Sequence, residues 1–167
     1  MKKIIHLTVF LAIISALAGA TLAFVNNMTS PIIEERKIAA VKTTLEAIFP
    51  TASEYKEISF VDASGTVKNA YEAVGVGYAF NVTVQGYKDV ITFIVGIDGS
   101  GKIVGFKVNY VNDTPGLGSK VADPEFANSI IGKNVGDKVD TISGSTVSSA
   151  AIVKGIDAAK AVYQSLK

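Results

Sequence analysis

The chain has 167 residues, enough for one folded domain and a short additional element. It carries 16 Lys and Arg against 15 Asp and Glu, with neither a basic stripe for nucleic acid nor an acidic run typical of disorder. It contains no cysteine, which excludes disulfides, a lipoprotein anchor, thiolate metal sites and cysteine catalysis.

The first predicted element is an apolar segment, residues 1–28, in which no Asp, Glu, Lys or Arg occurs from Ile4 to Val25. About 22 such residues can cross the hydrocarbon core of a bilayer as a helix. A cleaved signal peptide is the alternative, because small residues of the cleavage type lie within the run, but the run exceeds the usual apolar length of a signal peptide. The pattern favours a retained anchor. Lys2 and Lys3 precede it, so the positive-inside rule predicts a cytoplasmic N-terminus and an extracytoplasmic remainder.

Residues 29–50 are predicted to form an amphipathic helix that links the anchor to the domain. Ser30–Pro31 is a helix start signal. Apolar residues then recur at helical spacing from Ile38 to Ile48, and Pro50 ends the helix.

Residues 51–167 are predicted to form one α+β domain. Alternating or β-rich runs at residues 55–61, 76–84, 89–97 and 102–111 indicate strands, and "DGSG" between the last two indicates a hairpin turn. A short helix follows at 123–132, and a final helix with one apolar face runs from about Val147 to Leu166. The fold class expected is an antiparallel sheet with a helix before it and helices after it.

One candidate loop is "NDTPGLGSK", residues 112–120, which interrupts the strand pattern. Gly116 and Gly118 let backbone N–H groups approach a ligand, and Pro115 stiffens the entry. Taken alone, such a loop is more often a structural turn.

The second candidate loop is "DTISGST", residues 140–146, directly before the last helix. A helix N-terminus presents unpaired amides and the positive end of the helix dipole, which suits a phosphate. A phosphate on Thr146 would face the amides of Val147, Ser148 and Ser149. The alternative is that Thr146 or Ser145 is a plain N-cap, whose removal costs about 1 kcal/mol.

The order of anchor, α+β domain, "NDTPGLG" and "DTISGST" resembles the FMN-binding G subunit of the Rnf ferredoxin:NAD⁺ oxidoreductase complexes, and the related C subunit of the Na⁺-translocating NADH:quinone oxidoreductase. In that family Asp, two residues, Ser or Thr, Gly, Ala and Thr mark covalent flavin attachment. A flavin transferase that uses FAD joins FMN to the last Thr as a phosphoester. Asp140, Ser143, Gly144 and Thr146 match this pattern, and Ser145 stands where Ala is usual. The family's "ETPGLG" loop corresponds to residues 113–118, with Asp113 replacing Glu.

The resemblance implies a flavin site built from both loops. Thr114 and Leu117 are expected to contact the ring, Tyr78 and Tyr87 are candidates for stacking on it, and Lys120, Lys138 and Lys154 could screen its charge. The cofactor-binding residues expected are Thr146, as the covalent attachment point, and Asp140, Ser143, Gly144, Ser145, Val147, Ser148, Thr114, Gly116, Leu117 and Gly118.

The function expected from the resemblance is electron transfer by FMN on Thr146 within a membrane-bound, ion-translocating ferredoxin:NAD⁺ oxidoreductase complex. Expected partners are the flavoprotein that forms the D subunit, the small integral subunits and the flavin transferase, in the cytoplasmic membrane. The sequence offers no nucleophile–base–acid set, since the single histidine, His6, lies in the anchor. The alternative is a membrane-tethered binding or assembly module without a redox cofactor.

Overall fold

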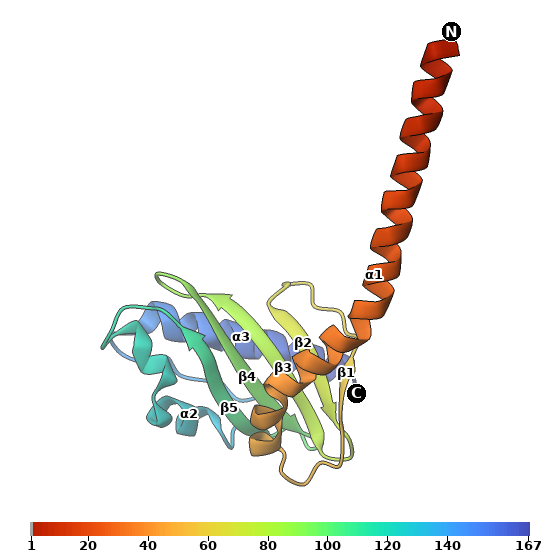
Figure 1. Cartoon of the computed structure of the whole chain (residues 1–167). Helices are drawn as coiled ribbons and strands as arrows, with labels where there is room; N and C mark the ends of the chain where they lie inside the picture. Colours follow the sequence, from red (N-terminus) through yellow and green to blue (C-terminus); the bar gives the residue numbers. More distant parts are fainter. Residues whose placement is uncertain (1) are drawn as a thin grey trace. The chain divides into compact units, whose positions relative to one another are not determined.

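The computed structural model describes residues 2–167, except for the side chains of residue 2 and residues 27–40. The chain divides into two units, Met1–Val41 and Lys42–Lys167. Helix α1 (Lys2–Ile48) contributes to both units, and all the other elements belong to the second (Figure 1).

Within α1, Lys3–Asn26 is long and apolar enough to cross a membrane. This segment has 24 residues and a mean hydropathy of 2.3, and none of it is buried within the protein. The linker helix predicted for residues 29–50, with its start at Ser30–Pro31, falls largely on residues 27–40, outside the described side chains. The backbone there continues α1. The domain boundaries after residues 28 and 50 therefore stay predictions.

The second unit contains one five-stranded antiparallel sheet in the order β1-β2-β3-β4-β5, so every strand pairs with its neighbour in sequence. The fold class predicted from the sequence is confirmed. The strands are β1 (Tyr55–Ile58), β2 (Val67–Ala73), β3 (Gly77–Gln85), β4 (Val90–Asp98) and β5 (Ile103–Val111). The helices that follow are η1 (Gly118–Ala122), a 3-10 helix, α2 (Pro124–Ile130) and α3 (Thr146–Ser165).

Helix α3 covers one face of the sheet and builds the main core with it (Figure 1). Ile152 and Ile156 of α3 are fully buried in this core. The packing is close at Gly155, where an added Cβ would lie 2.8 Å from Val82 Cγ1 and 2.9 Å from Phe93 Cζ. Because α3 packs closely on β3 and β4, the position of its first residues relative to the sheet is fixed.

The opposite face of the sheet receives the last turns of α1. Leu45 and Phe49 are buried there, and the side chain of Ile48 occupies the space that a Cβ on Gly96 or Gly105 would need. Those two glycines are paired across β4 and β5. A stripe without side chains therefore lets the end of α1 approach the strands closely.

Local signals in the sequence are confirmed at the β4–β5 hairpin and at the two ends of α2. Asp98 Oδ1 accepts hydrogen bonds from the Ser100 and Lys102 amides, and Gly101 has a φ of 93°, which closes the β4–β5 hairpin as expected. Pro124 lies in the first turn of α2 and Gly132 lies just past its end. Strand β2 was not predicted, because Lys, Asn and Glu interrupt its apolar pattern.

Candidate functional site

The two candidate loops meet at one end of the sheet and enclose a cavity of about 490 Å³, the first cavity. Three segments form its walls: the 86–88 turn between β3 and β4, the 113–118 loop after β5, and residues 144–148 at the start of α3. Segments far apart in sequence meet here because β3, β5 and α3 all end or begin at this edge. Its lining residues are Tyr87, Asp113, Thr114, Leu117, Gly118, Gly144, Ser145, Thr146, Val147 and Ser148.

The hydroxyl groups near the start of α3 lie in different environments. Ser149 is fully buried, and its Oγ donates to the Ser145 carbonyl and accepts from the Ile142 amide. Ser148 Oγ donates to Asp113. Thr146 is exposed, and none of the hydrogen bonds among the described side chains involves its hydroxyl. Thr146 therefore presents a free hydroxyl to the cavity.

Helix α3 begins at Thr146, so this residue is not an N-cap. Ser145 occupies the N-cap position, but its side chain makes no capping hydrogen bond. Its φ and ψ of −126° and 29° lie outside the extended geometry usual for a capping residue. Ser145 therefore holds the N-cap position, as one alternative expected, but it does not cap the helix through its side chain, and the assignment of Thr146 as the N-cap is wrong.

The amides at the start of α3 remain available to an anion. The Ser149 amide, expected to face a phosphate, donates instead to the Ser145 carbonyl, and this is the first hydrogen bond within the helix. The amides of Thr146, Val147 and Ser148 precede it and are the ones that a helix N-terminus leaves unpaired. Together with the positive end of the dipole, they favour negative charge at this position.

The hydroxyl of Ser145 is the second polar feature of this helix start. Ser145 is 4% exposed, and its Oγ is a buried atom without a hydrogen-bond partner among the described residues. An unpaired buried hydroxyl is costly, so it is a natural partner for an added polar group.

The 113–118 loop folds as a tight turn. The amides of Leu117 and Ser119 both donate to the Thr114 carbonyl, and the Gly116 amide donates to Ser119 Oγ. Gly116 has a φ of 75°, a conformation that glycine adopts without strain. Gly116 thus shapes the turn but does not line the first cavity, whereas Leu117 lines it and is half exposed.

Asp113 is a site residue to which the sequence pattern assigns no role of its own. It is 7% exposed, and its carboxylate accepts from the amides of Tyr87, Lys88 and Thr114 at 3.0, 3.3 and 2.9 Å. Ser148 Oγ donates to it at 2.6 Å. Burial raises the pKa of Asp113, but the hydrogen bonds from Ser148 and the three amides lower it more, so the pKa lies below its ordinary value.

Asp140 and Ser143 lie outside the first cavity, although they belong to the same loop. Asp140 lines a second cavity of about 370 Å³, beside α2, and Ser143 is exposed. No hydrogen bond or ion pair ties the Asp140 carboxylate to another described residue. Nothing in the described fold therefore requires a carboxylate at this position.

The other side chains expected near the flavin lie at different places in the structure, and not all of them line the first cavity. Tyr87 lines the first cavity and is 70% exposed. Tyr78 does not line it, since its ring packs edge-on against Tyr163 with the centroids 6.0 Å apart. Lys120 lines the second cavity. The side chains of Lys138 and Lys154 are exposed and line neither of the two cavities.

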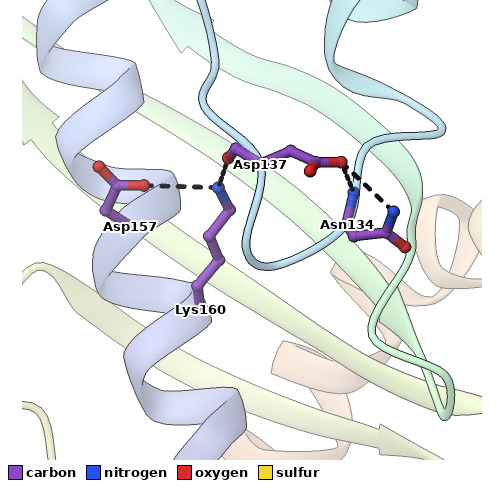
Figure 2. Close-up of polar contacts among 4 residues, drawn as sticks. All are labelled: Asn134, Asp137, Asp157 and Lys160. Atoms are coloured by element: carbon purple, nitrogen blue, oxygen red, sulfur yellow. Dashed lines mark hydrogen bonds and ion pairs between the residues drawn. The ribbon is translucent and has the colours of Figure 1, made fainter.

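A buried lysine holds the segment that leads into the second candidate loop, residues 140–146. Lys160 of α3 is 5% exposed, and its Nζ donates to the Asp137 carbonyl at 2.7 Å and lies 3.5 Å from Asp157 Oδ1 (Figure 2). Asp137 Oδ2 in turn accepts from the Asn134 amide at 2.7 Å, which closes the turn shown in Figure 2. The chain before Asp140 is thereby fixed to the same helix that carries Thr146.

The residues present fit a phosphate-linked aromatic cofactor such as FMN. The free amides and the unpaired Ser145 hydroxyl suit a phosphate, and the exposed apolar side chains of Tyr87, Leu117 and Val147 surround the same cavity. Its volume lies within the range usual for small-molecule sites, roughly 300–1,000 Å³.

Comparisons with known proteins point to the same cofactor. The sequence profile of the FMN-binding domain family matches residues 86–161. The G subunit of the ion-translocating oxidoreductase complex of Methanosarcina acetivorans is 31% identical over 95% of this chain and 93% of its own length. The G subunit of the Na⁺-translocating ferredoxin:NAD⁺ oxidoreductase complex of Acetobacterium woodii is 25% identical over 99% and 94%. The G subunit of the proton-translocating ferredoxin:NAD⁺ oxidoreductase complex of Clostridium ljungdahlii is 23% identical over 93% and 89%.

Proposed function

The chain belongs to the G-subunit family of ion-translocating oxidoreductase complexes, and we propose that it is the FMN-carrying electron-transfer component of a ferredoxin:NAD⁺ oxidoreductase of this kind. It is anchored in the membrane by the apolar segment Lys3–Asn26. Bound FMN would supply the ability to accept and release electrons, which the side chains of the protein lack.

We infer that FMN is attached covalently to Thr146. The observation that carries this proposal is the free, exposed hydroxyl of Thr146 at the first position of α3, inside the first cavity. In the transfer, a bond forms between Thr146 Oγ and the FMN phosphorus of FAD, and the pyrophosphate P–O bond breaks. AMP leaves, and the hydroxyl proton passes to a base of the flavin transferase or to solvent. The resulting phosphodiester keeps one negative charge beside the helix N-terminus.

The chain's own residues would bind and orient the cofactor. The amides of Thr146, Val147 and Ser148 would donate to the phosphate, and the Ser145 hydroxyl would add a further donor. Thr114 and Leu117, which line the cavity from the 113–118 loop, would contact the ring, and Gly118 lines the same wall. Asp140 and Ser143, which lie outside this cavity, belong to the surface that the transferase recognises.

The topology proposed has a cytoplasmic N-terminus and an extracytoplasmic flavin domain. Two lysines precede the apolar segment, which supports this orientation. The direct electron partners would then be membrane components of the complex, namely the flavoprotein that forms the D subunit and the small integral subunits. No stand-alone catalysis is expected, because the chemistry belongs to the cofactor.

The experiment is to express the full chain together with a flavin transferase and to examine it by denaturing gel fluorescence and intact mass. We expect a fluorescent band whose mass exceeds that of the chain by FMN less one water. Thr146→Ala should be dark, and Thr146→Ser, which keeps the hydroxyl, should fluoresce. Thr141→Ala is the matched control, since Thr141 is an exposed hydroxyl of the same loop outside the first cavity.

The Thr146→Ala variant should be nearly as stable as the wild type, so a loss of fluorescence would not result from unfolding. Thr146 is exposed and makes no capping bond, so Thr146→Ala should change the free energy of unfolding by no more than about 0.5 kcal/mol. A dark wild-type band of unmodified mass, from cells that contain the transferase, would rule out the carrier function and favour a tethered binding module.

A further inference from the structure

Asp113 connects all three walls of the first cavity. Its Oδ2 accepts from the Tyr87 amide and from Ser148 Oγ, and its Oδ1 accepts from the amides of Lys88 and Thr114. One carboxylate thus joins the 86–88 turn, its own loop and the first turn of α3. Contacts with charged acceptors are among the stronger hydrogen bonds in proteins.

The surrounding backbone leaves this carboxylate no room to move. A Cβ on Gly118 would lie 2.5 Å from Asp113 Cγ, and a Cβ on Gly86 would lie 2.9 Å from Asp113 Oδ2. Both glycines therefore allow the backbone to close around the side chain. Packing and hydrogen bonds fix Asp113 in one position.

The charge of Asp113 is present at neutral pH and is not neutralised by an ion pair. None of the ion pairs among the described side chains includes Asp113. Because Asp113 lines the first cavity and is itself 7% exposed, any molecule bound there lies near a fixed negative charge.

We propose that Asp113 is a positioning residue that holds the three walls of the flavin cavity together and lowers the midpoint potential of the bound flavin. The inference rests on the proposed function, since it places FMN in this cavity. Reduction adds electron density to the flavin ring, and a nearby carboxylate disfavours that change electrostatically. Asp113 does not react itself, and it acts through the position of the walls and through its field.

The test compares Asp113→Asn with the control Asp89→Asn in the full, flavin-loaded chain in detergent. Asn keeps the size of the side chain, but it loses the charge and replaces one acceptor by a donor. Asp89 lies at the same end of the sheet and accepts from Val90, Tyr110 and Asn112, but it does not line the first cavity. We expect the midpoint potential of Asp113→Asn to be more positive than that of the wild type and that of Asp89→Asn to be unchanged.

Hydrogen exchange measures the positioning role without using the flavin. In Asp113→Asn, amide exchange in peptides that cover the 86–88 turn and the 113–118 loop should be faster by roughly tenfold. Asp89→Asn should leave exchange in the 113–118 loop unchanged. If wild-type chain carries no FMN, the proposed function fails, while the exchange result still decides whether Asp113 holds the walls.

Two further variants keep the inference testable if Asp113→Asn does not fold. Asp113→Glu retains the charge and should keep the potential near the wild-type value. Ser148→Ala removes one donor and should accelerate exchange in the 86–88 turn with a smaller change in potential. A folded, flavin-loaded Asp113→Asn with wild-type potential, or wild-type exchange in both variants, would overturn the inference.

Discussion

Gly118→Ala is the substitution for which the structure predicts the largest effect at the cavity. The new Cβ would lie 2.5 Å from Cγ and 2.9 Å from Oδ1 of Asp113, which is held in place by its hydrogen bonds. Overpacking of this kind costs about 1–3 kcal/mol. Displacing a carboxylate from its donors costs roughly a further 1.5–3 kcal/mol. We therefore expect a loss of about 2.5–6 kcal/mol in the free energy of unfolding.

Two other glycines provide matched controls. Gly116 lies two residues earlier in open space, but its φ of 75° makes alanine unfavourable by about 1–2 kcal/mol. Gly136 has open space and is not among the glycines with positive φ, so alanine there should be neutral or stabilising by about 0.4–1 kcal/mol. The expected order of stability is Gly136→Ala, then Gly116→Ala, then Gly118→Ala.

The assay is thermal and urea unfolding of the full chain in detergent, followed by far-ultraviolet circular dichroism. For a folded unit of this size, the loss at Gly118 corresponds to a fall of about 8 °C or more in the unfolding midpoint. If Gly118→Ala unfolded within about 1 kcal/mol of Gly136→Ala, the close packing of Asp113 against the loop would be refuted.

Three further outcomes are expected. Burial raises the pKa of Asp62, Asp98 and Asp113, but their hydrogen bonds lower it more, so each pKa is below its ordinary value in the native state. These carboxylates therefore stabilise the native state above the ordinary aspartate pKa of about 4, and this stability is lost as pH falls through the lowered pKa values. Denaturant unfolding should show a lower stability at about pH 3 than at about pH 7, and equal stability would contradict the prediction. Ser149→Ala should cost about 1–3 kcal/mol by urea unfolding, because the Ile142 amide loses its acceptor, whereas an unchanged midpoint would argue against that bond. Removal of residues 1–41 should move the protein from the membrane fraction to the soluble fraction with cooperative unfolding retained, and unfolded or membrane-bound product would contradict the division into two units.

The sequence predicted most of the fold because its signals were local. Asp98 to Gly101 closes a hairpin through bonds that span only a few residues, and Pro124 begins a helix by its fixed φ. Strand β2 lacks such a signal, because Lys, Asn and Glu interrupt its apolar pattern. Its buried positions include Ala70 and Ala73, whose small side chains give a weak alternation signal.

The sequence predicts the two loops of the candidate site but not the hydrogen bonds that connect them. The bond from Ser148 to Asp113 joins residues 35 positions apart, and no periodicity encodes such a contact. The sequence likewise indicates a hydroxyl cap before the last helix, whereas in the structure Ser145 makes no capping bond and its Oγ is buried. The backbone of Ser145, with φ of −126° and ψ of 29°, departs from the extended geometry of a capping residue, and no local sequence signal encodes that departure.

The sequential order of the strands has a consequence for the biogenesis of the protein. Each strand pairs with the one that precedes it, so the sheet can form as the chain emerges, without waiting for distant segments. The cavity is different, because its third wall belongs to α3, the last element in chain order. A nascent chain that stops before α3 lacks both Thr146, the proposed attachment point, and the third wall of the cavity. Under the proposed function, a flavin on Thr146 therefore identifies chains whose synthesis has passed the start of the last helix.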